Sequence, residues 1–136
     1  MERSKALASL SALANEDRMD LVRLLVPRGA EGLAAGEIGR ALGLSASRLS
    51  FHLSTLEQAG LVRSRKVSRN VIYAADLAGI GGTISYLLAD CCMDHPEIIA
   101  CCGASARHAL HRVAEGDLAP RAEGDLVPRT VTDRES

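Results

Sequence analysis

The chain has few aromatic side chains and no tryptophan. Phe51, Tyr73 and Tyr86 are the only aromatics among its 136 residues. Proteins that bind single-stranded nucleic acids stack bases on several aromatic rings, so this composition disfavours that class. The apolar content of 47% comes almost entirely from Ala, Leu, Val and Ile. We therefore expect a small helical protein, and duplex DNA as the nucleic acid that suits it best.

Long apolar segments are absent too. No run is long enough to span a membrane, and no charged-then-apolar leader is present. We therefore expect a cytoplasmic protein with no membrane partner, built as one domain with a tail. In the reducing cytosol, clustered thiols more often bind soft metals or sense redox state than form structural disulfides.

The four cysteines form two adjacent pairs, Cys91-Cys92 and Cys101-Cys102. The spacing Cys-x-x-Cys is absent, so neither a zinc ribbon nor a thioredoxin-like site is indicated. Adjacent residues on a regular helix point about 100° apart, so both members of a pair can face one ion only where the helix ends. Pro96 predicts such an end just after the first pair.

Charge is distributed unevenly along a chain of net charge −1. Residues 61–75 carry four basic side chains and no acid, which suits phosphate, whereas residues 114–136 carry six acids and three bases. Two octapeptides, AEGDLAPR (114–121) and AEGDLVPR (122–129), lie in this acidic tail. Their composition predicts disorder rather than a repeat fold. A partner-binding segment or an engineered addition is the alternative.

The first half of the chain predicts a helix-turn-helix. Leucines and alanines at helical spacing predict a helix over residues 3–14, and Asn15 followed by two acids is typical of the N-cap of a second helix. A short third helix ends at Gly43. The fourth begins at Ser45 and ends at Gly60. The last two helices and their tight turn form the helix-turn-helix pattern.

Two strands and a final helix complete the predicted fold. Residues 61–67 and 71–75 are rich in Val, Ile and Tyr and are joined by turn-forming residues. A helix-turn-helix followed by a basic hairpin is a winged helix. From Asp76 a last helix delivers Cys91 and Cys92 at its C-terminal end. The predicted fold class is mainly α with a small β-hairpin, a winged helix-turn-helix.

Residues 47–62 carry the most specific sequence pattern, SRLSFHLSTLEQAGLV, followed by the basic hairpin and a helix that ends in Cys91-Cys92. Over about residues 5–105 the chain thereby resembles the ArsR/SmtB family of metal-responsive repressors, and within it the arsenic-responsive branch with C-terminal cysteines. This resemblance implies a homodimer paired through its first and last helices and bound to an inverted-repeat operator in double-stranded DNA. It also implies a domain over residues 1–105 that includes the metalloid site, with a tail over 106–136.

The resemblance implies As(III) or Sb(III) as the inducer. As(III) is thiophilic, and three thiolates can replace the three hydroxyls of arsenite. Many arsenical repressors carry Cys-x-Cys in the first helix of the helix-turn-helix, but residues 33–42 contain no cysteine. The available ligands are therefore Cys91, Cys92, Cys101 and Cys102. Which of the last two is the third ligand is open, as is whether the site lies within one subunit.

Other ligands for the thiols stay open. A trivalent methylarsenical held by two sulfurs, another thiophilic metal such as tetrahedral zinc, and oxidation of the thiols are the alternatives. His95 lies beside the cluster, and His108 and His111 lie one helical turn apart. We interpret these histidines as solvated surface residues, with zinc binding as the weaker option.

The predicted recognition helix turns polar residues outward when its three leucines face inward. The candidate DNA-binding residues are Ser45, Ser47, Arg48, Ser50, Phe51, His52, Arg65 and Arg69. Phe51 would either touch a thymine methyl or pack against neighbouring loops. His52 flanks the apolar stripe, and a role as a hydrogen-bonded structural residue is favoured over a DNA contact. Arg65 and Arg69 in the wing would meet phosphates or the minor groove, although a solvated basic face is the alternative.

A small thiol enzyme, such as an arsenate reductase, is the rival from another class. The sequence lacks a phosphate-cradling loop and an obvious base next to a cysteine. We therefore expect a regulator rather than an enzyme. A repressor whose vicinal thiols oxidise is a second rival.

Overall fold

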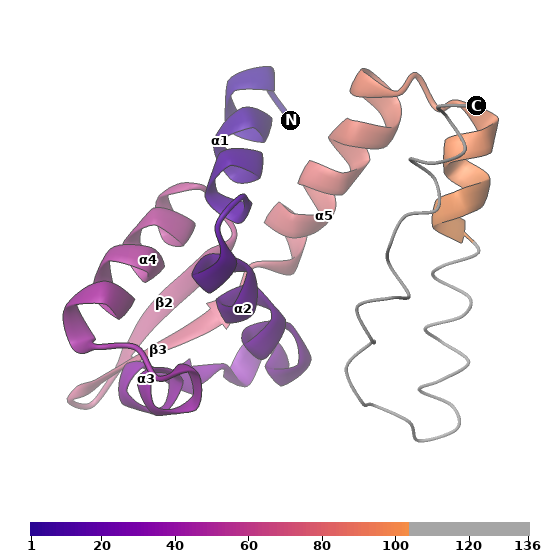
Figure 1. Ribbon diagram of the computed structural model, residues 1–136. Coiled ribbons are helices and arrows are strands. Elements are labelled where there is room, and N and C mark those ends of the chain that lie inside the picture. The colour runs from indigo at the N-terminus through magenta and orange to yellow at the C-terminus, as the bar shows by residue number, and fades with distance from the viewer. Residues whose placement is uncertain (104–136) are drawn as a thin grey trace. The chain divides into compact units, whose positions relative to one another are not determined.

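A computed structural model describes residues 1–103; the repeat tail, His108 and His111 lie outside the described residues. The chain divides into two compact units, Met1–Asp94 and a second that begins at His95. In the second unit, residues 96–103 are helical. The first unit (Figure 1) contains, in chain order, α1 (Arg3–Leu13), α2 (Glu16–Leu25), a 3-10 segment η1 (Val26–Glu31), β1 (Leu33–Ala34), α3 (Ala35–Leu42), α4 (Ala46–Gln58), β2 (Val62–Val67), β3 (Asn70–Ala75), α5 (Leu77–Tyr86) and a π-helical segment η2 (Leu87–Cys91).

Local capping interactions set the helix boundaries where the sequence predicts them. The Asn15 side chain accepts the Arg18 N–H at 3.0 Å and begins α2, and the Ser45 hydroxyl accepts the Arg48 N–H at 3.3 Å and begins α4. Gly43 closes α3 with a left-handed backbone, at φ 68°. These caps confirm the predicted helix-turn-helix.

The core gathers around α4. Leu49, Leu53 and Leu56 are buried on one stripe of this helix, as its spacing predicts. They belong to one cluster with buried residues of α2, α3 and β2, including Leu21 and Ile38. α1 is tied to this body because the buried Ser9 hydroxyl donates to the Ala59 carbonyl at 3.0 Å. Within residues 1–103, no helix combines the length and apolar character needed to cross a bilayer.

The wing is a hairpin extended by a third, short strand. Strands β2 and β3 pair antiparallel, with Val62 opposite Ala75 and Val67 opposite Asn70, so the turn consists of Ser68 and Arg69. β1 pairs with the other edge of β3, which gives the order β1-β3-β2. The predicted hairpin is confirmed, but β1 was not predicted because two residues are too few to show an alternating pattern.

Gly32 allows the chain to approach this sheet closely. It adopts φ 63° and ψ −160°, a region that side chains rarely enter, and a Cβ there would collide with the Tyr73 carbonyl oxygen of β3. Gly29 has a similar backbone, at φ 59° and ψ −147°, but a Cβ on it would meet nothing within 4 Å.

These two glycines provide a matched test of the close approach. Gly29→Ala should lower the free energy of unfolding by about 1–3 kcal/mol through backbone strain alone. Gly32→Ala should lower the free energy of unfolding by about 1–3 kcal/mol more than Gly29→Ala does, because the clash forces β1 away from β3. Urea unfolding of both variants measures the difference. Equal losses would contradict the proposed packing of Gly32 on Tyr73.

Candidate functional site

Helix α4 presents a polar face opposite its buried leucine stripe. Ser47, Arg48, Ser50 and Phe51 are exposed on this face. The Phe51 side chain is 64% exposed and makes an edge contact with the His52 ring, with 5.5 Å between the ring centroids. In the structure Phe51 is therefore not packed against neighbouring loops, which was one of its two predicted roles. An exposed aromatic ring on this helix is available to a partner.

Ser50 faces the side of α4 that is nearest the wing. It lines a cleft of about 470 Å³ between α3, α4 and β3, with Arg40 and Val71 among the other lining residues. Tyr73 lines the same cleft, and partial burial, together with the Glu57 carboxylate, raises the pKa of its phenol. Tyr73 is therefore an uncharged hydrogen-bonding group near neutral pH.

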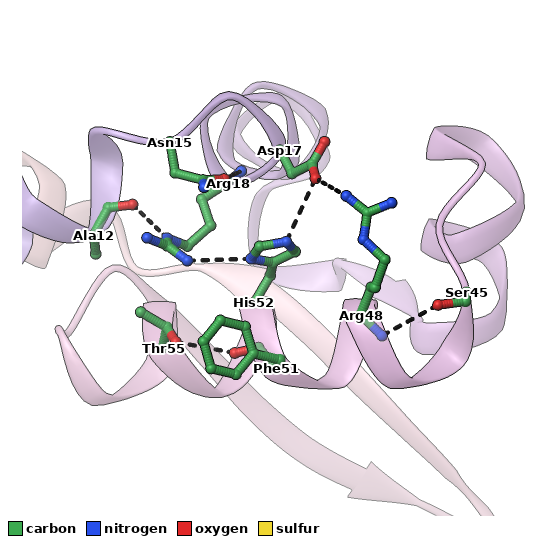
Figure 2. A network of polar contacts seen from close by, with 9 residues as sticks. All are labelled: Ala12, Asn15, Asp17, Arg18, Ser45, Arg48, Phe51, His52 and Thr55. Atoms are coloured by element: carbon green, nitrogen blue, oxygen red, sulfur yellow. Dashed lines mark hydrogen bonds and ion pairs between the residues drawn. The ribbon is translucent and has the colours of Figure 1, made fainter.

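His52 lies on the inner side of α4 and is only 7% exposed. Its Nδ1 lies 3.2 Å from Nη1 of Arg18, whose Nε donates to the Ala12 carbonyl at 2.7 Å (Figure 2). A guanidinium can only donate, so Nδ1 is the acceptor and the neutral ring carries its proton on Nε2. Burial and these contacts agree with the structural role that the sequence favours for His52.

Asp17 joins this network to the exposed face of α4. Its Oδ2 accepts a hydrogen bond from Nη2 of Arg48 at 2.7 Å and lies 3.5 Å from Nε2 of His52 (Figure 2). Neither Asp17 nor Arg18 was singled out from the sequence. The acids after Asn15 signal only a helix N-terminus, and a contact between residues 31 positions apart leaves no periodic trace.

The two predicted wing arginines differ in their contacts. Arg65 donates to the Ala30 and Glu31 carbonyls at 2.9 and 3.1 Å, which ties β2 to η1. Arg69 lies at the exposed tip of the hairpin, and within residues 1–103 the structure gives it no hydrogen bond or ion pair. A phosphate that reached the wing would find the Arg69 guanidinium uncommitted.

The cysteine pairs fall in two different units. Cys91 ends the π-helical segment that continues α5, and Cys92 follows it, as the predicted helix end requires. Cys101 and Cys102 lie in the helical residues 96–103. Cys92 is partly exposed and the other three thiols are exposed. Among residues 1–103, no three His, Cys, Asp or Glu side chains already form a metal-binding group.

His95 has a local structural role. Its Nδ1 accepts the backbone N–H of Glu97 at 3.2 Å, and its carbonyl accepts the N–H groups of Ile98 and Ile99 at 3.0 Å. It therefore caps the helical residues that begin at Pro96. This contact agrees with the interpretation of His95 as a surface residue rather than a metal ligand.

Comparison with known proteins identifies the helix-turn-helix independently. A family model described as a helix-turn-helix domain matches residues 13–65, which include α2, α3 and α4. The transcriptional activator HlyU of Vibrio cholerae is 36% identical over 84 residues, which cover 62% of this chain and 75% of HlyU. The putative arsenical resistance operon repressor ArsR of Halobacterium salinarum is 41% identical over 70 residues, which cover 52% of this chain and 54% of that protein.

Solved structures agree with this match. Reduced HlyU from V. cholerae superposes with a TM-score of 0.52 at 35% identity, covering 62% of this chain and 86% of the HlyU chain. An ArsR-like transcriptional regulator from Rhodococcus sp. RHA1 superposes with a TM-score of 0.55 at 25% identity, covering 82% of this chain and 93% of that one. These matches confirm the prediction of a regulator rather than an enzyme. The chain belongs to the ArsR/SmtB family of winged-helix transcriptional regulators, which bind DNA through the helix-turn-helix.

Proposed function

We propose that this protein is a cytoplasmic repressor that leaves its operator when As(III) or Sb(III) binds its cysteine thiolates. One observation carries the proposal: Cys91 and Cys92 lie where the helical segment that continues α5 ends, Cys101 and Cys102 follow after eight residues, and each thiol is at least partly exposed. The similarity to a putative arsenical resistance repressor supports the choice of inducer.

The positions of the cysteines suit three-coordinate As(III). Cys91 and Cys92 lie where the helix ends, so two adjacent sulfurs can turn toward one atom there. Cys101 and Cys102 lie on helical residues and point about 100° apart, so one of them would supply the third thiolate. Closing the short segment between the pairs costs little entropy. Arsenic would itself draw the two pairs together.

Dimerisation would cover the apolar surface of α5. This helix carries no charged residue, yet within the described chain only Thr83 is buried on it. Leu77 and Ile84 are 55% and 51% exposed. Helix α1 contacts α5 (Figure 1), and its Leu7 is also 55% exposed. A helix that is apolar on all sides is normally buried, so a second copy paired through α1 and α5 is the simplest cover.

DNA would be read by α4 from each subunit of this dimer. Two recognition helices related by twofold symmetry fit successive major grooves of an inverted repeat. Ser47 and Arg48 face outward for phosphates or base edges, and Phe51 for a thymine methyl. Arg69, at the tip of the wing, would contact the backbone.

Release requires the inducer to prefer the form that cannot bind DNA. To change the repressor from mostly DNA-bound to mostly free, the inducer must bind the DNA-free form about 5.5 kcal/mol more favourably than the DNA-bound form. Three arsenic–sulfur bonds at the end of the dimer helix would change how α5 pairs and so how the two α4 helices are spaced. The thiol site and the DNA-binding face are thereby linked through the dimer.

Oxidation of the vicinal thiols is the second candidate signal. The relative HlyU was solved in a form named reduced, and the thiols of this chain are at least partly exposed and so open to oxidants. A methylated trivalent arsenical, which needs only two sulfurs, is a further variant of the first proposal. Peroxide under otherwise identical conditions distinguishes oxidation from metalloid binding.

Serine substitutions of the cysteines test the inducer site. Cys91→Ser and Cys92→Ser should each fold and bind operator, since serine has nearly the same volume, but arsenite should no longer release them. Of Cys101→Ser and Cys102→Ser, one should leave arsenite-driven release of the operator nearly unchanged, and the other should impair it. Fluorescence anisotropy of labelled operator, titrated with arsenite under reducing conditions, measures release. Arsenite release from the Cys91→Ser, Cys92→Ser double variant would reject the site.

A charge on the exposed face of α5 tests the dimer. Ile84→Glu should destabilise the dimer by about 3 kcal/mol or more, because an unpaired carboxylate would be buried between subunits. Val26→Glu, at a position 40% exposed on η1, is the matched control and should remain dimeric. Sedimentation velocity measures both. An unchanged dimer for Ile84→Glu would place the interface elsewhere.

The wing is tested by salt dependence. Arg69→Ala should weaken binding to all DNA sequences alike and reduce the slope of log affinity against log salt by about one per subunit. Arg65→Ala should weaken DNA binding in the same way. It should also lower the free energy of unfolding, because the Arg65 guanidinium donates to two backbone carbonyls. An unchanged slope for Arg69→Ala would reject its phosphate contact.

A further inference from the structure

Asp17 places a fixed negative charge beside the DNA-facing side of α4. The carboxylate belongs to the first turn of α2 and accepts a hydrogen bond from the Arg48 guanidinium at 2.7 Å. Figure 2 shows the Arg48 side chain extending toward Asp17, although 62% of this side chain stays accessible to solvent. Arg48, the single Lys or Arg side chain of α4, is therefore already paired within the protein.

The position of Asp17 is determined by groups on its inner side. Arg18 donates to the Ala12 carbonyl at 2.7 Å and lies 3.2 Å from Nδ1 of His52. Nε2, on the other side of the buried imidazole, lies 3.5 Å from Oδ2 of Asp17 (Figure 2). Asp17 thus has a buried imidazole on one side and an exposed guanidinium on the other. Only the second of these partners can leave without disturbing the core.

We propose that Asp17 acts as an internal stand-in for a DNA phosphate, which holds Arg48 until duplex DNA replaces it. Carboxylate and phosphate oxygens are equivalent partners for a guanidinium. The pair is exposed, with side chains 62% and 31% accessible, so it is weak enough to exchange. This inference rests on the proposed function, in which α4 faces the DNA.

Exchange at Asp17 would set the overall affinity for DNA. Each binding event must break the Asp17–Arg48 pair, and this cost is the same for every DNA sequence. Asp17 therefore lowers the affinity for operator and for random duplex alike. A repressor with lower affinity needs less inducer binding energy for release.

Asp17→Asn tests this exchange because it removes the charge and keeps the shape of the side chain. Glu16→Gln is the matched control: it lies in the same helical turn, makes the same change in net charge, is exposed, and within residues 1–103 has no hydrogen bond or ion pair. Relative to this control, Asp17→Asn should bind duplex DNA about two- to fivefold more tightly per subunit. The gain should disappear in an Arg48→Gln background.

The probes are a random-sequence duplex and an operator selected by the protein from a random library, both titrated by anisotropy. Equal affinities for Asp17→Asn and Glu16→Gln, or weaker binding by Asp17→Asn, would overturn the inference while the proposed function stands. No binding of either duplex by the wild type would instead refute the proposed function.

A measurement on the wild type covers the case in which Asp17→Asn fails to fold. The side-chain ¹⁵N signals of Arg48 should shift as duplex is added, in parallel with the backbone amide signals of α4. Shifts of the α4 amides with no change at the Arg48 guanidinium would overturn the exchange.

Discussion

Burial of one leucine stripe is the interaction on which the DNA-binding face depends. Leu49, Leu53 and Leu56 hold α4 against α2, α3 and the sheet, and removing one such side chain typically costs about 2–5 kcal/mol. A domain of this size has only about 5–15 kcal/mol of total stability, so the orientation of α4 is strongly determined. Because the stripe faces inward, the opposite face of α4 is left for a partner. α1 is attached to the C-terminal end of this helix through Ser9, and the wing is tied to η1 through Arg65.

The polar contacts divide into those that build the domain and those that remain exchangeable. Arg18 and His52 are partly or fully buried, and they join the end of α1 to the inner side of α4. The contact between Asp17 and Arg48 lies at the surface, where a phosphate can compete for it. Binding DNA can therefore rearrange charges at the surface of α4 without disturbing the core beneath it.

The sequence predicts those features that depend on residues close together in the chain, and misses those that depend on residues far apart in it. Caps such as Asn15 and Ser45 act within three residues, so the helix boundaries and the helix-turn-helix were predictable. The contacts of Asp17 with Arg48 and of Arg65 with Ala30 join residues 31 and 35 positions apart, and no local pattern reveals them. The cysteine pairs were visible from the sequence, and their assembly around one atom stays a prediction because it depends on the ligand.

Reciprocal coupling between arsenite and operator DNA is the most direct measure of the central claim. If arsenite releases the repressor, thermodynamic linkage requires that operator weakens arsenite binding by the same factor. Isothermal titration of arsenite into the wild-type protein under reducing conditions, with and without saturating operator duplex, gives both affinities. The proposed function predicts an arsenite dissociation constant at least about tenfold higher on the operator. The same constant in both titrations would show that thiol binding and DNA binding are independent.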